Sequence, residues 1–129
     1  MHRVRTRSSV LVVCALLSAC SGTSVDRPEP SFVGKTWISS DSSAPLGTLR
    51  IFQADGTLVM DSCFETYRLA KWRALDDRRM EWQEDTARIE AEVTQATANQ
   101  LQMRLHLVSE VKEENYHLAQ VPFVCPDNR

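Results

Sequence analysis

Two cysteines, Cys63 and Cys125, carry the most definite chemistry in this chain. A catalytic thiol or a metal-binding pair would need a histidine or another cysteine at a suitable spacing, and none is visible around either residue. In an oxidising compartment such a pair usually forms a disulfide. We therefore predict a Cys63–Cys125 disulfide, provided that the chain is exported.

Histidines and carboxylates supply the remaining candidates for metal binding or acid–base chemistry. His106 and His117 fall in neighbouring predicted strands, with Glu90, Glu92 and Glu114 as candidates to lie near them. Histidines on exposed strand faces are usually solvated, and no compact ligand spacing accompanies these two, so we predict no metal and no other cofactor. The chain has no Gly-Xaa-Ser-Xaa-Gly elbow, phosphate-binding loop or His-Glu-Xaa-Xaa-His motif. We therefore expect no catalytic residues and no enzyme, with a hydrolase as the minor alternative.

A further cysteine, Cys20, follows a segment typical of protein export. Three arginines within the first seven residues precede an apolar run over residues 10–17, which is shorter than the about 20 residues of a membrane-spanning helix. The sequence Leu17-Ser18-Ala19-Cys20 resembles the lipobox of a bacterial lipoprotein signal peptide. The resemblance implies cleavage before Cys20, acyl chains on this cysteine and, from Ser21 in the next position, the outer membrane. The alternative is an ordinary secretory signal cut nearby.

This interpretation divides the chain into a signal peptide over residues 1–19, a flexible tether over 20–31 and one domain over 32–129. Without the leader, 12 basic residues stand against 17 acidic ones, a formal charge of −5. An acidic chain disfavours nucleic acid and electrostatic docking on anionic lipid. We therefore expect contact with the membrane through the acyl chains, and a domain in the periplasm.

The sequence from Phe32 onward predicts about eight short strands. Apolar and polar residues alternate most clearly over residues 89–93 and 101–107. Asp85 could cap a helix over residues 86–97, which are rich in alanine and glutamate, but the alternation favours a strand. Consecutive strands joined by short turns pair antiparallel, and closure into a barrel removes exposed edges. We predict an all-β fold, a small antiparallel barrel of about eight strands, with a β-sandwich as the alternative.

The clearest local element is a hairpin centred on Asp55-Gly56, a pair that suits the left-handed backbone of a short turn. We expect a four-residue loop over residues 53–56 between strands 47–52 and 57–60. If the barrel forms, we expect Leu49 and Ile51 to face inward, together with Leu58 and Met60. The other residues expected to face inward are Trp82, Ile89, Val93, Leu101, Met103 and Leu105.

The predicted disulfide conflicts with a strict up-and-down barrel. The third and eighth strands of such a barrel end at opposite rims, and a six-residue strand rises roughly 20 Å. Disulfide-bonded Cα atoms lie within about 7 Å of one another. Cys63 then lies within a strand, one element is miscounted, or the C-terminal tail folds back along the barrel.

Several motifs after the tether carry a family resemblance. They are Gly34-Lys35-Thr36-Trp37, Phe52-Gln53-Ala54-Asp55-Gly56-Thr57, the segment 67–72, Met80-Glu81-Trp82 and the ending over 121–126. Together they resemble uncharacterised proteobacterial lipoproteins with a small lipocalin-like β-barrel. The resemblance implies a small barrel with room for a ligand, and it implies no catalytic residues.

The predicted function is non-catalytic binding. We expect a lipid-anchored envelope lipoprotein whose outer face and loops dock an envelope protein partner. The alternative is a carrier of a small apolar or amphipathic ligand, with Tyr67, Trp72, Trp82 and Met103 around the pocket. The size of these side chains favours a packed interior over an open one.

Overall fold

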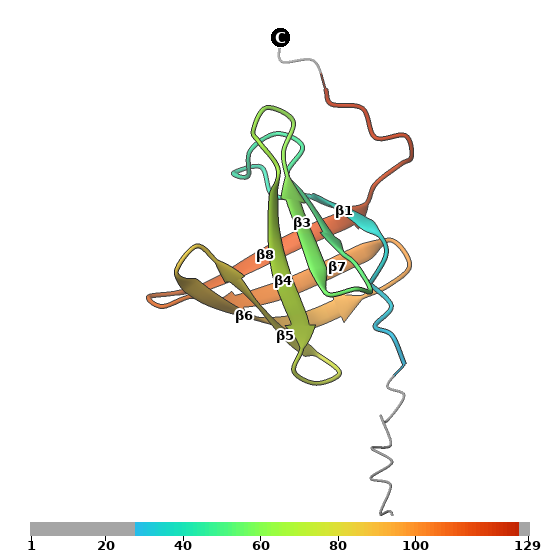
Figure 1. Ribbon diagram of the computed structural model, residues 1–129. Helices are drawn as coiled ribbons and strands as arrows, with labels where there is room; N and C mark the ends of the chain where they lie inside the picture. Colours follow the sequence, from blue (N-terminus) through green and yellow to red (C-terminus); the bar gives the residue numbers. More distant parts are fainter. Residues whose placement is uncertain (1–27, 127–129) are drawn as a thin grey trace, which may run out of the picture.

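Each strand of this protein pairs with the strand that follows it in the sequence. The computed structural model describes residues 28–126, so the predicted signal peptide and Cys20 lie outside the described residues. The eight strands are β1 (Thr36–Ser39), β2 (Leu49–Phe52), β3 (Thr57–Asp61), β4 (Arg68–Ala74), β5 (Arg79–Glu84), β6 (Ala87–Ala96), β7 (Gln100–His106) and β8 (Val111–Leu118). All neighbours are antiparallel, and β8 pairs with β1 to close the barrel (Figure 1). The predicted all-β, eight-stranded barrel is confirmed, including a strand in place of a helix at β6. None of the described residues forms a helix long and apolar enough to cross a bilayer.

Residues 53–56 separate β2 from β3 as predicted, but Gln53 and Thr57 still form a hydrogen-bonded pair, which leaves a three-residue turn over residues 54–56. The Gln53 N–H donates to the Thr57 carbonyl at 2.8 Å, which makes these residues the last pair of the hairpin. The Gly56 N–H donates to the Gln53 carbonyl at 3.1 Å, and Gly56 has a φ of 79°. A turn that ends in a residue with positive φ is a common form of three-residue hairpin loop.

This pairing determines the two faces of β2. Arg50 lies opposite Met60, and Phe52 lies opposite Leu58. A shift of register by one residue exchanges the inward and outward side chains of a strand. The prediction that Leu49 and Ile51 face inward is therefore wrong, because Arg50 and Phe52 share the inward face with Met60 and Leu58.

Aromatic and aliphatic side chains fill one end of the barrel, here called the closed end. Phe32, which precedes β1, packs on Phe52 with ring centroids 5.3 Å apart and on Trp72 at 6.0 Å. The Trp37 Nε1–H donates to the Phe32 carbonyl at 2.8 Å and fixes this segment against the barrel. The largest fully buried side chains are Trp37, Trp82, Phe52, Leu58, Met80, Leu101 and Met103. The packed interior expected from large side chains is thus present at this end.

The C-terminal tail returns along the outside of the barrel to the opposite end. Strand β8 ends at the closed end, whereas β3 ends at the other, and the red tail in Figure 1 rises from β8 toward the loops that follow β1 and β3. Cys125 in this tail forms a disulfide with Cys63, with a Cα–Cα distance of 5.5 Å. The predicted disulfide is confirmed, and a tail that folds back resolves its conflict with the meander.

Candidate binding site

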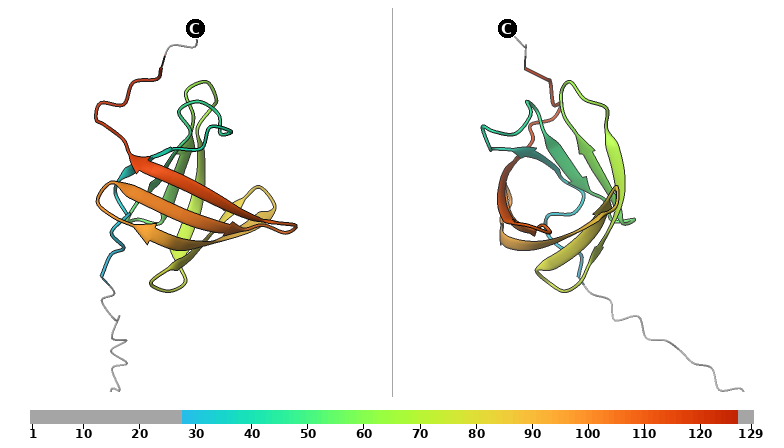
Figure 2. Two further views of the ribbon diagram at one scale, coloured as in Figure 1. Left: turned by 180° about the vertical axis from the view of Figure 1, so that it is seen from behind. Right: turned by 90° about the vertical axis from the view of Figure 1, so that its left-hand side faces the viewer.

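The end of the barrel opposite the aromatic plug, here called the mouth, holds a cavity of about 620 Å³. The strands curve around a common interior, seen from two further sides in Figure 2. Apolar side chains of Met60, Ile89, Leu105 and Leu107 line part of the cavity, and charged side chains line much of the rest. Pockets for small molecules typically measure about 300–1,000 Å³, so this volume suits one small ligand.

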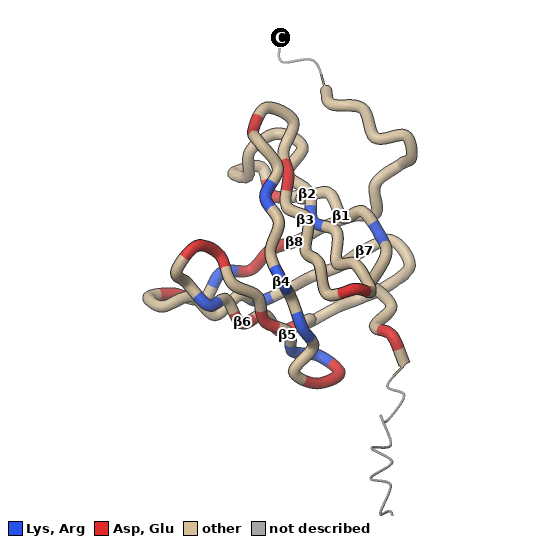
Figure 3. Tube along the Cα trace, in the orientation of Figure 1, with Lys and Arg blue, Asp and Glu red and all other residues tan. Residues whose placement is uncertain are grey.

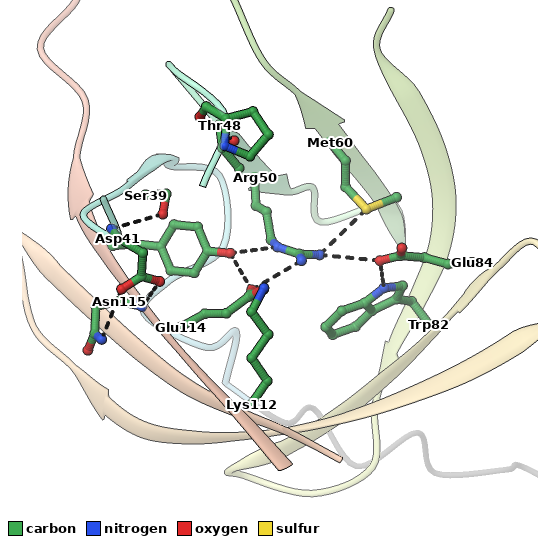
Figure 4. A network of polar contacts seen from close by, with 12 residues as sticks. Ser39, Asp41, Thr48, Arg50, Met60, Trp82, Glu84, Lys112, Glu114 and Asn115 are labelled. Carbon is green, nitrogen blue, oxygen red and sulfur yellow. Dashed lines mark hydrogen bonds and ion pairs between the residues drawn. The ribbon is translucent and has the colours of Figure 1, made fainter. Parts of the chain in front are cut away.

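Arg50 occupies the floor of the cavity (Figure 4). Its Nε–H donates to the Tyr116 hydroxyl oxygen at 2.7 Å, and its terminal nitrogens lie 3.1 Å from Glu114 Oε2 and 3.6 Å from Glu84 Oε1. The guanidinium carbon also lies 5.1 Å from the centre of the Trp82 ring. Because a buried charge is costly without partners, these contacts explain how an arginine with 11% exposure is accommodated inside a barrel.

Strand β8 supplies the counter-charge. Glu114 Oε2 accepts a hydrogen bond of 2.5 Å from the Tyr116 hydroxyl, and Glu114 Oε1 accepts one of 2.9 Å from Lys112 Nζ. Lys112, Glu114 and Tyr116 occupy alternate positions of β8 and all line the cavity. The interior face of this strand is therefore polar, unlike that of β7, where Leu101, Met103 and Leu105 are buried.

The network holds its groups in fixed protonation states at neutral pH. Burial raises the pKa of Tyr116 and keeps its hydroxyl protonated. Burial acts against the charges of Glu114 and Arg50, but their mutual attraction and hydrogen bonds outweigh it. The pKa of Glu114 is therefore lowered and that of Arg50 raised. All three shifts lead away from neutral pH, so the network provides stable charges and not a proton-exchanging group.

Glu84, at the end of β5, is the less compensated carboxylate of the floor. Its Oε1 accepts a hydrogen bond from Trp82 Nε1–H at 2.8 Å, while Arg50 stays 3.6 Å away. Its Oε2 lies 3.9 Å from Arg68, whose side chain is 61% exposed. A distant and solvated cation neutralises a carboxylate weakly. Glu84 therefore presents negative charge to the cavity.

The four predicted pocket residues do not line this cavity. Tyr67 is 60% exposed in the β3–β4 loop, Met103 is in the core, and Trp72 lies at the closed end, where its Nε1–H donates to the Gln53 carbonyl at 3.0 Å. Trp82 alone touches the charged network, through Glu84 and Arg50. Trp72 and Trp82 pair across β4 and β5 and line a second pocket of about 370 Å³ on that hairpin, so the predicted aromatic pocket does not coincide with the cavity at the mouth.

The two histidines considered as metal ligands lie apart. His117 pairs with Gln100 at one end of the β7–β8 hairpin, and His106 pairs with Val111 at the other. His117 Nδ1 lies 3.0 Å from the Ser40 hydroxyl oxygen. Over residues 28–126, no three His, Cys, Asp or Glu side chains gather in a way that could hold a metal ion.

Sequence reasoning missed Arg50, Glu84 and Tyr116. The signal for Arg50 lay in the hairpin, because a three-residue loop places residues 50, 52, 58 and 60 on one face. Tyr116 belongs to a strand whose inward residues are polar, and alternation of apolar residues cannot detect such a face.

No protein-family model, no curated protein and no solved structure matches this chain. The resemblance to proteobacterial lipoproteins therefore stays a prediction.

Proposed function

We propose that this protein is a lipid-anchored lipoprotein of the bacterial envelope that binds a small amphipathic ligand in the mouth of its barrel. The observation that carries the proposal is the 620 Å³ cavity, with an apolar wall on one side and charged groups on its floor. An amphipathic molecule matches both surfaces, whereas a purely apolar one would strip water from Arg50, Glu84 and Glu114 without replacing it.

Two properties of the floor support binding over catalysis. The pKa values of Arg50, Glu114 and Tyr116 are all displaced away from neutrality, so none of the three is suited to exchange a proton with a substrate. Each of these side chains also contacts the others, which fixes its position. A rigid floor with constant charge favours selection of a ligand.

The position of the chain ends fits an anchored protein. The described N-terminal residues approach the closed end, on which Phe32 packs, while the mouth lies at the opposite end (Figure 1). With acyl chains on Cys20, this arrangement would place the closed end toward the membrane. The mouth would then open toward the periplasm, where a soluble ligand can enter it.

Native mass spectrometry of the protein extracted from membranes in mild detergent tests the ligand directly. We expect a retained small molecule on the wild-type protein and its loss from Leu107→Trp, because Leu107 lines the cavity. The matched control is Leu69→Trp, at a position 61% exposed on the outer face of β4. It should retain the molecule.

Two results would contradict this proposal. One is a protein that carries no small molecule in any form. The other is a bound molecule that Leu107→Trp does not displace. Attachment to the membrane is tested separately with Cys20→Ala, which should move the protein from the membrane fraction to the soluble periplasm.

A second candidate function, docking of an envelope protein, is favoured by exposed apolar side chains around the disulfide. Phe64 and Val124, each next to a bridged cysteine, are 61% and 75% exposed, and the Leu46 carbonyl accepts a hydrogen bond from the Cys63 N–H at 3.0 Å. A photoreactive residue at position 64 should cross-link one discrete partner. The same residue at Val108, which is 98% exposed on another loop, should not. Equal labelling from both positions would count against a docking site.

A further inference from the structure

We infer that the ligand of the mouth cavity carries a positive charge beside an apolar body, as a protonated amphipathic amine does. This inference rests on the proposed ligand-binding function and adds the chemical class of the ligand.

The described lining of the cavity is acidic overall. Six carboxylates stand against three cationic side chains, and acidic residues mark several loops at this end of the barrel (Figure 3). The carboxylates are Asp41, Asp61, Glu65, Glu84, Glu113 and Glu114, and the cations are Arg50, Arg68 and Lys112. The walls of a cavity exclude water and strengthen the field of such charges, so a cation is attracted and an anion repelled.

A buried arginine in a barrel would ordinarily suggest an anionic ligand, such as a carboxylate. Here the guanidinium of Arg50 is already engaged by Glu114, Glu84 and the Tyr116 hydroxyl (Figure 4). Lys112 is committed to the same Glu114, at 2.9 Å. An anionic ligand would have to displace Glu114 from Arg50 and leave a buried carboxylate unpaired. Arg50 is therefore a structural cation and not a receptor for anions.

The carboxylates toward the β3 and β5 side of the mouth are the ones that can accept a further cation. Glu84 has cations only at 3.6 and 3.9 Å. Asp61 accepts a hydrogen bond from the Ser62 N–H and Glu65 one from the Ser62 hydroxyl, and no cation of residues 28–126 forms an ion pair with either carboxylate. An ammonium group placed beside Glu84 would be closer to this carboxylate than Arg50 at 3.6 Å or Arg68 at 3.9 Å and would leave the shorter Arg50–Glu114 pair intact.

The apolar wall lies next to this carboxylate. Ile89 on β6 lies across from Trp82, two residues before Glu84 on β5, and Leu105 on β7 follows β6 around the barrel. Ile89, Leu105 and Leu107 all line the cavity. A ligand with its cation at Glu84 can therefore lay an alkyl or aromatic body along β6 and β7.

Three probes of equal chain length test the charge. Octylamine, octanol and octanoate are titrated into the full-length protein at neutral pH, where the amine is protonated, with the fluorescence of the buried tryptophans as the signal. We expect octylamine to bind at least about tenfold more tightly than octanol, and octanoate to bind most weakly, because one charge-assisted contact contributes about a factor of ten or more. The preference for the amine should decrease as salt is added.

Glu84→Gln identifies the residue responsible. The amide oxygen can still accept the Trp82 hydrogen bond, so the variant should fold, and its affinities for octylamine and octanol are compared with each other. Its affinity for octylamine should fall to that for octanol. Glu92→Gln is the matched control, because Glu92 lies on the outer face, 3.7 Å from Arg104, and should change neither affinity. If Glu84→Gln does not fold, Glu65→Gln at the rim should reduce the amine preference in the same direction.

The outcomes separate this inference from the proposed function. Octanol or octanoate binding as tightly as octylamine overturns the cationic class while ligand binding stands. An amine preference that both Glu84→Gln and Glu65→Gln leave intact overturns the assigned position of the charge. Failure of all three probes to bind, together with no retained molecule in native mass spectrometry, overturns both proposals.

Discussion

Replacing Arg50 by methionine should lower the free energy of unfolding by about 3 kcal/mol. Methionine fills much of the space of the arginine stem but leaves Glu114 without its buried cation. Breaking a buried ion pair by removing one partner typically costs about 3–5 kcal/mol. Lys112 and the Tyr116 hydroxyl still contact Glu114 in the variant, which places the loss at the lower end of this range.

A double-mutant cycle separates the lost ion pair from lost packing. Glu114→Gln alone should cost about 2 kcal/mol, because Arg50 then keeps only the more distant Glu84 as a charged partner. The double variant Arg50→Met/Glu114→Gln removes both charges together and should cost about 2 kcal/mol, less than the sum of the single losses. The expected coupling free energy is therefore about 3 kcal/mol.

Urea unfolding followed by tryptophan fluorescence measures these values, since Trp37, Trp72 and Trp82 are all buried and report on the whole barrel. The control is Arg104→Met, because Arg104 is 41% exposed and pairs with carboxylates on the outer face. Exposed pairs contribute about 0–1 kcal/mol. A loss for Arg50→Met no larger than that for Arg104→Met, or a double variant that loses the full sum of the two single losses, would contradict a stabilising ion pair between Arg50 and Glu114.

Three further predictions concern the disulfide, a tight turn and acid stability. Replacing Cys63 and Cys125 together by serine should cost about 4 kcal/mol in urea unfolding, the chain-entropy value for a bridge across 62 residues; a variant as stable as the wild type would contradict this. Gly47→Ala should lower the melting temperature more than Gly34→Ala. Both glycines have positive φ, at 71° and 73°, and this backbone conformation costs about 1–2 kcal/mol for alanine. A Cβ at Gly47 also meets the Cys63 sulfur, whereas a Cβ at Gly34 meets nothing within 4 Å. Equal losses of melting temperature would show that the contact with Cys63 is unimportant. Burial opposes the charge of Glu114, yet its neighbours lower its pKa, so the stability it contributes is present above 4.5 and is lost as the pH falls through the lowered pKa. Acid titration of Glu114→Gln should show a shallower loss of stability than the wild type, and parallel curves would contradict the assignment.

The sequence predicted well those features that depend on alternation and on redox chemistry. Leu101, Met103 and Leu105 alternate with polar residues on β7, and all three are buried. Alternation of apolar and polar residues indicates which side chains become buried on folding. In a sheet with one buried side, burial determines which side chains face inward. The expected oxidising compartment predicted the pairing of Cys63 with Cys125, and the structure confirms it, although a strict up-and-down barrel places the ends of the third and eighth strands at opposite rims.

The candidate site could not be predicted in the same way, because its position depends on whether Gln53 and Thr57 still pair at the β2–β3 turn. Over residues 49–52, Leu49, Ile51 and Phe52 are hydrophobic, and alternation of Leu49 and Ile51 with the charged Arg50 favours an outward Arg50. The β2–β3 hydrogen bonds decide otherwise, because they place Arg50 opposite Met60. Once Arg50 is inside, Glu114 and Tyr116 on β8 become its necessary partners. A charged interior thus follows from backbone register, which side-chain hydrophobicity describes poorly.

The two halves of the barrel interior differ in the kind of stability that they provide. The closed end follows the ordinary rule for a core, with Phe32, Phe52 and Trp72 in mutual contact. At the mouth, Arg50 and Glu114 occupy inward positions where apolar side chains of similar volume would stabilise the fold equally well or better. A buried ion network beside an unfilled cavity therefore gives the fold little stability that a packed core would not also give. Its arrangement is best explained by a ligand that needs fixed charges. The double variant Arg50→Met/Glu114→Gln keeps Glu84, so it should lose about 2 kcal/mol of stability and still bind octylamine more tightly than octanol; loss of this preference would show that Arg50 and Glu114 also take part in recognition.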